Sequence, residues 1–196
     1  MIRFPLLVAV TLAVAAPAAA QNQSEGYKFL QAVKDAKGDD VIAAVEKPGS
    51  RIVDTRDISN GEGALHIVVR RGDSTYVRYF LQHGADPDLR DGQGNTPLML
   101  AVTEGESSMI DLLVAAHANV NLGNTAGETP LIRAVQRRDV GMVRQLLQAG
   151  ASADQRDRVA GLSARDYAQR DTRTPALLKV INEKPEKPPV VMGPKL

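Results

Sequence analysis

The strongest constraint on this chain is a short pattern that returns at a nearly constant step. The segment TPLMLA at 96–101 returns as TPLIRA at 129–134. GALHIV at 63–68 precedes TPLMLA by the same interval, and SARDYA at 163–168 follows TPLIRA by an only slightly longer interval. A regular step of about 33 residues predicts a repeat architecture, in which one small unit of structure is used several times.

A second, independent marker follows the same step. It consists of paired apolar residues followed by a turn of small and polar residues. Its three copies are YFLQHGADPD at 79–88, LLVAAHANVN at 112–121 and QLLQAGASAD at 145–154. Two markers that share one spacing make a chance similarity very improbable, so we expect true structural repeats.

The residues within each unit predict two short helices joined by turns. Thr96 and Thr129 have the side chain that caps a helix N-terminus, and the prolines after them suit the first helical position, which needs no N–H donor. Gly105 is expected to end the first helix. Gly84 and Gly150 are expected to end the second helix of their units.

Two residues depart from the glycine pattern. His117 stands where Gly84 and Gly150 stand in the neighbouring units, so we expect it to adopt a positive φ. Arg138 stands at the position of Gly105, and we expect the turn that follows the first helix of that unit to be closed differently.

Helix, turn, helix and a projecting turn, repeated at this step with the motif T-P-L-x-x-A, resemble the ankyrin repeat. The resemblance implies an all-α solenoid of about five helix-turn-helix units, with degenerate capping units at both ends. It also implies that His66, at the His position of the T-P-L-H motif, ties adjacent turns together by hydrogen bonds. The expected units of the domain at 21–182 are 25–57, 58–90, 91–123, 124–156 and 157–182.

The segments outside this domain have different compositions. Residues 1–20 combine a basic start, an apolar run and a small-residue exit at Ala18–Ala20, which is typical of a secretory signal peptide cleaved after Ala20. We therefore expect a periplasmic or secreted protein, of bacterial type because it has no cysteine to form disulfides. Residues 183–196 are rich in proline and are expected to form a disordered tail.

Charge balance limits the classes of partner. The chain has 24 Lys and Arg residues against 23 Asp and Glu residues, and loss of Arg3 with the predicted leader would balance them. This composition gives no general electrostatic case for binding nucleic acid or an anionic membrane. We expect no nucleic-acid partner, no membrane insertion after cleavage and a monomeric chain.

Candidate chemistry does not converge in this sequence. The histidines His66, His83 and His117 lie in different units at different places, and no pair has the spacing of a metal site. Asp86 and Asp88 suggest a calcium loop, but Arg90 occupies its third ligand position and Pro97 its twelfth. There is no cysteine, no G-x-S-x-G and no phosphate-binding loop. We predict no enzyme activity and no catalytic, metal or cofactor residues.

The resemblance implies a protein partner, bound by the turn tips and the inner-helix surface. The function expected is a protein–protein interaction module, and the alternative is a regulatory or inhibitory accessory subunit of an exported enzyme. Arginine dominates the cations of this surface, and acidic residues are interleaved with it, which favours a protein partner of unidentified sequence. The expected partner-binding residues are Asn60, Glu62, Arg70, Arg71, Arg90, Gln93, Asn95, Thr103, Glu104, Thr125, Glu128, Gln136, Arg137 and Arg156.

Overall fold

The computed structural model describes residues 18–183, with side chains from residue 25 onward. Residues 1–17 of the predicted leader and residues 184–196 of the predicted tail lie outside this range. The elements of the described part, in chain order, are α1 (Ala18–Lys34), α2 (Gly38–Val45), the 3₁₀ helix η1 (Ile52–Asp54), α3 (Ala64–Arg70), α4 (Ser74–Gln82), α5 (Pro97–Glu104), α6 (Ser107–Ala115), α7 (Pro130–Gln136), α8 (Val140–Gln148), α9 (Ala164–Arg170) and α10 (Pro175–Asn182).

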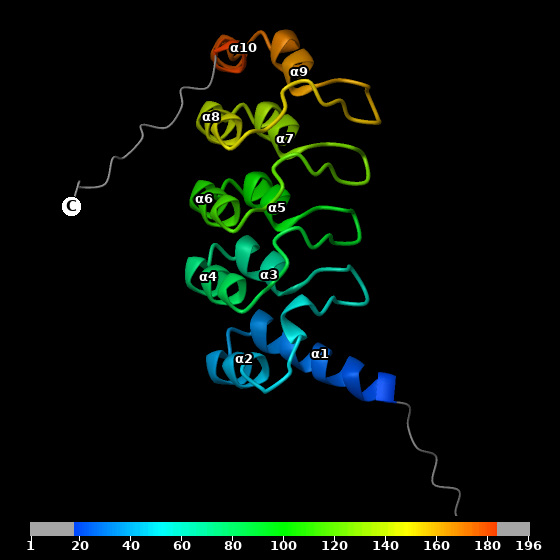
Figure 1. Ribbon diagram of the computed structural model, residues 1–196. Helices are drawn as coiled ribbons and strands as arrows, with labels where there is room; N and C mark the ends of the chain where they lie inside the picture. The colour runs from blue at the N-terminus through cyan, green and yellow to red at the C-terminus, as the bar shows by residue number, and fades with distance from the viewer. Residues whose placement is uncertain (1–17, 184–196) are drawn as a thin grey trace, which may run out of the picture.

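The helices form five successive pairs that stack in chain order (Figure 1). The inner helices α1, α3, α5, α7 and α9 make one layer, and the outer helices α2, α4, α6, α8 and α10 make the other. Each inner helix packs against the inner helix of the next pair, as α3 does on α5 and α5 on α7. The predicted all-α solenoid of helix-turn-helix units is confirmed.

Side-chain caps start the inner helices where the repeated motif places them. The Thr96 side chain accepts a hydrogen bond from the N–H of Met99, and the Thr129 side chain accepts one from the N–H of Ile132. Ser163 does the same for α9 by accepting from the N–H of Asp166. Each cap satisfies an N–H that has no partner within the helix.

The sequence predicts a residue with positive φ at the end of the second helix in three units, and the structure confirms all three. Gly84 has φ 80°, Gly150 has φ 91° and His117 has φ 64°. Gly105, with φ 89°, ends the first helix of its unit as predicted.

The turn at Arg138 is closed differently from the turn at Gly105, as the sequence predicts. The N–H of Gly105 donates to the carbonyl of Ala101, four residues earlier, whereas the N–H of Arg138 donates to that of Val135, three residues earlier. Arg138 nevertheless has a positive φ of 58°, which is costly for a residue with a side chain. Its guanidinium donates to the carboxylate of Asp171 at 2.5 Å.

A continuous apolar core runs along the stack between the two helix layers. Leu98, Leu131 and Leu146 are fully buried, and leucine, isoleucine, valine and alanine make up most of the core around them. Its buried aromatic residues, Phe29 and Phe80, lie in the N-terminal units and pack edge to face with ring centroids 6.0 Å apart. Each unit buries its apolar side chains mainly against its neighbours, as stacked repeats must.

Side chains of the loops that follow the outer helices form a ladder across the unit boundaries. The Asp54 carboxylate accepts from the N–H of Asp86 at 2.8 Å, and the Asp88 carboxylate accepts from the N–H of Asn119 at 2.8 Å. The Asn121 side-chain oxygen continues the series by accepting from the N–H of Ser152 at 2.7 Å. Asp86 also accepts from the N–H of Asp88 within its own loop. The residues that suggested a calcium loop therefore serve as acceptors for backbone N–H groups.

Four projecting loops, here called fingers 1 to 4, extend from the stack on one side (Figure 1). They comprise residues 57–62, 91–95, 124–128 and 157–162, and each is closed by a backbone hydrogen bond between its first and last residues. Adjacent fingers are joined by one backbone hydrogen bond each, from Gly92 to Asn60, from Thr125 to Gln93 and from Arg158 to Ala126. The finger row is therefore a connected ribbon of backbone.

Glycine is needed in these fingers for two separable reasons, and finger 1 and finger 4 allow them to be measured apart. Gly61 and Gly161 have φ values of 73° and 66°. A Cβ at Gly61 would lie 2.6 Å from the backbone nitrogen of Gly92, whereas a Cβ at Gly161 would meet nothing within 4 Å. We expect Gly161→Ala to lower the free energy of unfolding by about 1 kcal/mol, and Gly61→Ala by about 2–4 kcal/mol. Urea denaturation measures both, and equal losses would show that finger packing contributes nothing.

His117 provides a second test of backbone conformation. Because its φ is 64°, we expect His117→Gly to leave stability unchanged or raise it by up to about 1 kcal/mol, with the extra freedom of the unfolded chain offsetting part of the relief. Ala116→Gly is the matched control, since Ala116 has φ −87° in the same turn and should lose stability. A clear drop in melting temperature for His117→Gly would contradict this account.

Candidate protein-binding surface

The last turns of the inner helices carry most of the predicted binding residues that are exposed. Arg70 and Arg71 lie at the end of α3, Glu104 at the end of α5, and Gln136 and Arg137 at the end of α7, all of them exposed. The finger residues Asn60, Gln93 and Thr125 are exposed as well, as is Arg156 just before finger 4, whereas Thr103 and Arg90 are half-buried. The repeat therefore sets these side chains at corresponding places in successive units.

A hollow of about 430 Å³ opens on this surface between α1 and α3. Ile67 contributes an apolar side chain to it, and Lys34, Arg70 and Arg71 contribute cations. Glu62 is the one carboxylate among the lining residues. The structure thus brings three of the predicted residues, Glu62, Arg70 and Arg71, around one concave site.

The expected exposure of Glu62 is wrong. Its side chain is buried at the base of finger 1, where the Arg70 guanidinium donates to one carboxylate oxygen and the Asn60 amide donates to the other. The hydrogen bond to Glu62 raises the pKa of Arg70 above its already high ordinary value. Glu62 therefore orients Arg70 from below the surface and is paired before any partner arrives.

Asn95 and Glu128 were also expected to be exposed, and both are buried. The Asn95 amide donates to the carboxylate of Asp91, and the Glu128 carboxylate accepts from Arg133 at 2.7 Å. Both residues occupy the base of a finger, where the chain turns into the inner helix beneath the neighbouring finger. Their polar groups are satisfied there by the stack itself, as buried polar groups must be.

Arg71, Arg90 and Arg137 are each held by a backbone carbonyl group. Arg71 donates to the carbonyl of Val33 at 2.8 Å, and Arg137 donates to that of Thr103 at 2.5 Å. Arg90 donates to the carbonyl of Gly123. Each of these bonds crosses a unit boundary, so the arginines help to join the stack while part of each guanidinium faces outward. Rigid side chains of this kind lose less entropy when they bind.

His66 has the tying role that the resemblance implied. It is fully buried, its Nδ1 accepts from the N–H of Gly63 at 3.1 Å, and its Nε2 lies 3.0 Å from the carbonyl oxygen of Asn95 in the next unit. This arrangement requires the proton on Nε2, which donates to that carbonyl. Burial lowers the pKa of His66 below the ordinary value of 6.5, because a buried ring resists charging.

Sequence reasoning placed Lys34 in the N-terminal cap without assigning it to the binding surface. In the structure its Nζ lies 2.7 Å from the Asp57 carboxylate, and its side chain lines the hollow beside Arg70. Lys34 ends α1 as Arg70 ends α3. Lys34 was not predicted because it precedes Arg70 by more than the step of the repeated motif. The capping unit also lacks the motif, so the sequence could not align the two positions.

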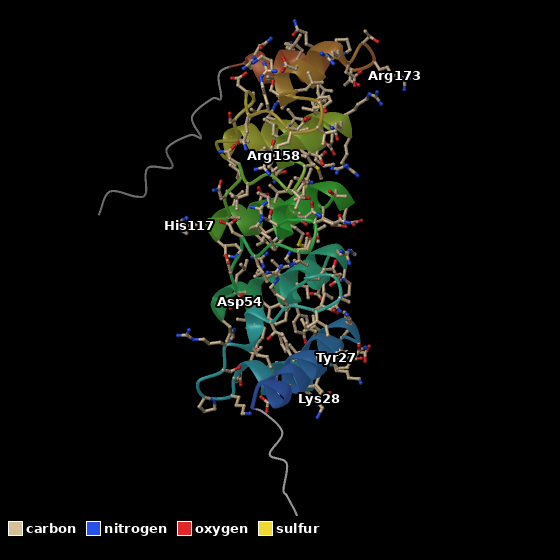
Figure 2. The ribbon with its side chains drawn as sticks, turned by 90° about the vertical axis from the view of Figure 1, so that its right-hand side faces the viewer. Tyr27, Lys28, Asp54, His117, Arg158 and Arg173 are labelled. Atoms are coloured by element: carbon tan, nitrogen blue, oxygen red, sulfur yellow. The ribbon has the colours of Figure 1, made fainter. Side chains whose placement is uncertain are left out.

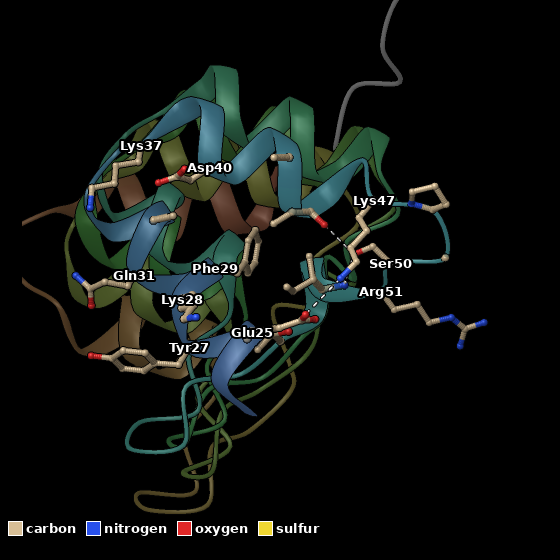
Figure 3. Close-up of a pocket in the computed structure, with 18 residues that line it drawn as sticks. Glu25, Tyr27, Lys28, Phe29, Gln31, Lys37, Asp40, Lys47, Ser50 and Arg51 are labelled. Atoms are coloured by element: carbon tan, nitrogen blue, oxygen red, sulfur yellow. Dashed lines mark hydrogen bonds and ion pairs between the residues drawn. The ribbon is translucent and has the colours of Figure 1, made fainter. Parts of the chain in front are cut away.

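A larger groove of about 960 Å³ lies at the N-terminal end of the stack, on the exposed face of the first unit (Figure 3). Phe29 points into it from α1, and the Lys47 side chain pairs with Glu25 at its edge. Asp40 and Ala44 occupy the α2 positions where α4 has Tyr76 and Phe80. These smaller and more polar side chains suit a capping unit, since no described element stacks beyond this face.

The described residues show neither a membrane span nor a metal cluster. Between residues 18 and 183, no helix combines the length and the apolar character that crossing a membrane requires. Over the same range, no group of three or more His, Cys, Asp or Glu side chains is placed to hold a metal ion.

The fold and this surface define the class as a stacked helical repeat with a concave side for binding. Comparison with known proteins gives the family: the model described as ankyrin repeats (3 copies) matches residues 17–124 and 65–157, and the chain belongs to that family. The chain is also 48% identical over 40 residues to a putative ankyrin repeat protein of Pyrobaculum aerophilum. That segment covers 20% of this chain and 15% of the relative. Ankyrin repeats mediate protein–protein interaction and are generally not catalytic.

The neutral state of buried His66 makes the stability of the stack depend on pH. Its pKa is lower in the folded chain than in the unfolded chain, so its contribution is complete above pH 6.5 and is lost as the pH falls below that value. We expect the free energy of unfolding to fall by at most about 1.4 kcal/mol per pH unit below 6.5 from this group. Urea denaturation between pH 7.5 and 5.5 measures the effect.

The control for this prediction is His66→Leu, which cannot titrate at that position. We expect this variant to be less stable than the natural chain at pH 7.5, because the N–H of Gly63 loses its acceptor and the Asn95 carbonyl its donor. It should nevertheless show a smaller fall between pH 7.5 and 5.5. Parallel curves for the two proteins would show that His66 is not the titrating group.

Proposed function

We propose that this protein is an exported binding module that recognises a protein partner through the inner-helix surface around the α1–α3 hollow. The observation that carries the proposal is the hollow itself, in which Ile67 lies among Lys34, Arg70 and Arg71. A site of this composition suits a partner segment with an apolar side chain next to a carboxylate. Export is supported by the leader-like composition of residues 1–20.

The charges of the hollow favour an acidic partner segment. Glu62 is buried and already accepts two hydrogen bonds, so it has little capacity to bind a cation. The Arg70 side chain retains 46% of its surface exposed, and that of Lys34 retains 38%, so both can reach a ligand. Further along the same surface, exposed Arg137 at the end of α7 adds another positive charge, whereas exposed Glu104 at the end of α5 adds a negative charge between those of Arg70 and Arg137.

A matched set of variants tests this site. We expect Lys34→Gln with Arg70→Gln to lower capture of the partner on the order of tenfold, since each removes a partly desolvated ion pair. Capture is measured from a cell-envelope or culture extract with the immobilised exported chain, and the bound protein is identified by mass spectrometry. Arg71 and Arg137 are left unchanged because their bonds to Val33 and Thr103 join the units.

Two further variants keep the result interpretable. Arg78→Gln with Arg144→Gln removes two exposed cations from the outer helices α4 and α8, and should leave capture unchanged. Glu104→Lys adds a cation to the inner surface, and should strengthen capture of the same partner. Melting curves establish that all variants fold. Equal capture by the hollow variants and the outer-helix variants would place the binding site elsewhere.

A further inference from the structure

The two end fingers share a feature that the two central fingers lack. Fingers 1 and 4 are closed over five residue steps, from Asp57 to Glu62 and from Asp157 to Leu162. Fingers 2 and 3 are closed over four steps. Each of these two longer fingers carries an exposed aliphatic side chain near its tip: Ile58 is 91% exposed and Val159 is 82% exposed. They are the two most exposed large apolar side chains of the described residues.

Hydrogen bonds accepted by one aspartate side chain brace each end finger and support these exposed tips. In finger 1 the Asp57 carboxylate accepts from the N–H of Ser59 at 2.9 Å and from Lys34 at 2.7 Å. In finger 4 the Asp157 carboxylate accepts from the N–H groups of three successive residues, 159–161, and from the hydroxyl of Tyr167. In both end fingers, the aspartate at the first position therefore holds the loop together through its side chain.

In both end fingers the negative charges are turned toward the stack and the positive charges are exposed. The carboxylates of Asp57 and Asp157 turn inward, and the hydrogen bond from Lys34 is the largest influence that lowers the pKa of Asp57. For Asp157, burial opposes ionisation, but the hydrogen bonds from Tyr167 and the three N–H groups outweigh it and lower its pKa. Arg56 and Arg158 are exposed beside the two apolar tips. Arg56 also donates to the carbonyl of Gly61 at 3.2 Å, which holds its charge beside finger 1. The row thus combines two aliphatic tips with exposed cations, although the whole chain is nearly neutral.

The tips of the four fingers form a straight edge, and such an edge can contact a flat surface. All four fingers project to the same side, and their tips lie nearly in line (Figure 1). Figure 2 looks onto this side and shows Arg158 on it, with Tyr27 and Lys28 of α1 at its lower end. Tyr27 is also largely exposed, at 66%.

We propose that the finger row docks on an anionic phospholipid surface. Ile58 and Val159 enter the headgroup region at the two ends of the row, and Arg56 and Arg158 pair with lipid phosphates. Apolar side chains flanked by cations are what interfacial binding to anionic membranes requires. The docking is peripheral, uses a surface other than the α1–α3 hollow, and does not depend on the proposed partner.

The centre of the row argues against a protein as the occupant. Protein interfaces concentrate their binding energy in large central side chains surrounded by a polar rim. Here the large apolar side chains are at the ends, and the central tips consist of Gly92, Gln93, Thr125 and Ala126. A fluid bilayer needs no central anchor, because lipids adapt to whatever the row presents.

Tryptophan reporters test the contact directly, because the chain has no tryptophan of its own. We expect the fluorescence of Ile58→Trp and of Val159→Trp to shift to the blue on phosphatidylcholine vesicles that contain phosphatidylglycerol, and to shift less as salt is added. Thr75→Trp, an exposed site on α4, should not shift. The chain is used as recovered from an exporting host, and all variants have the same N-terminus by mass spectrometry.

Vesicle sedimentation gives the independent measurement. Ile58→Ser with Val159→Ser, and separately Arg56→Gln with Arg158→Gln, should each lower the bound fraction at limiting lipid, with the partition coefficient falling on the order of tenfold. Arg78→Gln with Arg144→Gln removes the same charge elsewhere and should bind like the natural chain. Failure of both finger reporters to shift, or equal loss in the control variant, would overturn the proposal. A protein ligand at the tips would then be the alternative, and the capture assay on the hollow would be unaffected.

Discussion

Side-chain acceptors that pair with backbone N–H groups across unit boundaries are the interaction on which this structure depends. Each unit is too small to bury its own apolar face, so the stack exists only if neighbours meet in register. Burial alone is not directional and would tolerate sliding between helices. The bonds from Asp86 to Asp54 and from Asn119 to Asp88 fix that register because a donor one residue away would leave a polar group unpaired.

Register, once fixed, determines what the surface can present. The finger row is joined by one backbone hydrogen bond between neighbours, and the arginines on the inner side are held by carbonyl groups of adjoining units. Both the α1–α3 hollow and the finger row are therefore properties of at least two units. A single unit could not form either, which is why variation between copies, rather than the motif itself, carries the individuality of the protein.

The sequence predicted the parts of the fold that depend on local chemistry, such as the Thr96 and Thr129 caps and the left-handed His117. It also predicted that the turn at Arg138 is closed differently from the turn at Gly105. It failed at Glu62, Asn95 and Glu128, which are buried rather than exposed. A finger reverses within four or five residue steps, so exposed and buried positions are neighbours in sequence, and only the packing of the next finger distinguishes them.

Of the residues predicted to bind a partner, Glu62, Arg70 and Arg71 line the α1–α3 hollow, and their role in binding stays a prediction. Lys34 also lines the hollow but was not among the predicted residues, because its unit lacks the repeated motif. The buried histidine, in turn, bears on how the stack comes apart. The His66 tie occurs at a single boundary, because Met99 and Ile132 occupy the corresponding position in the next two units. Protonation of His66 therefore weakens the boundary between units 58–90 and 91–123. At low pH we expect the two units before this boundary and the three units after it to unfold separately.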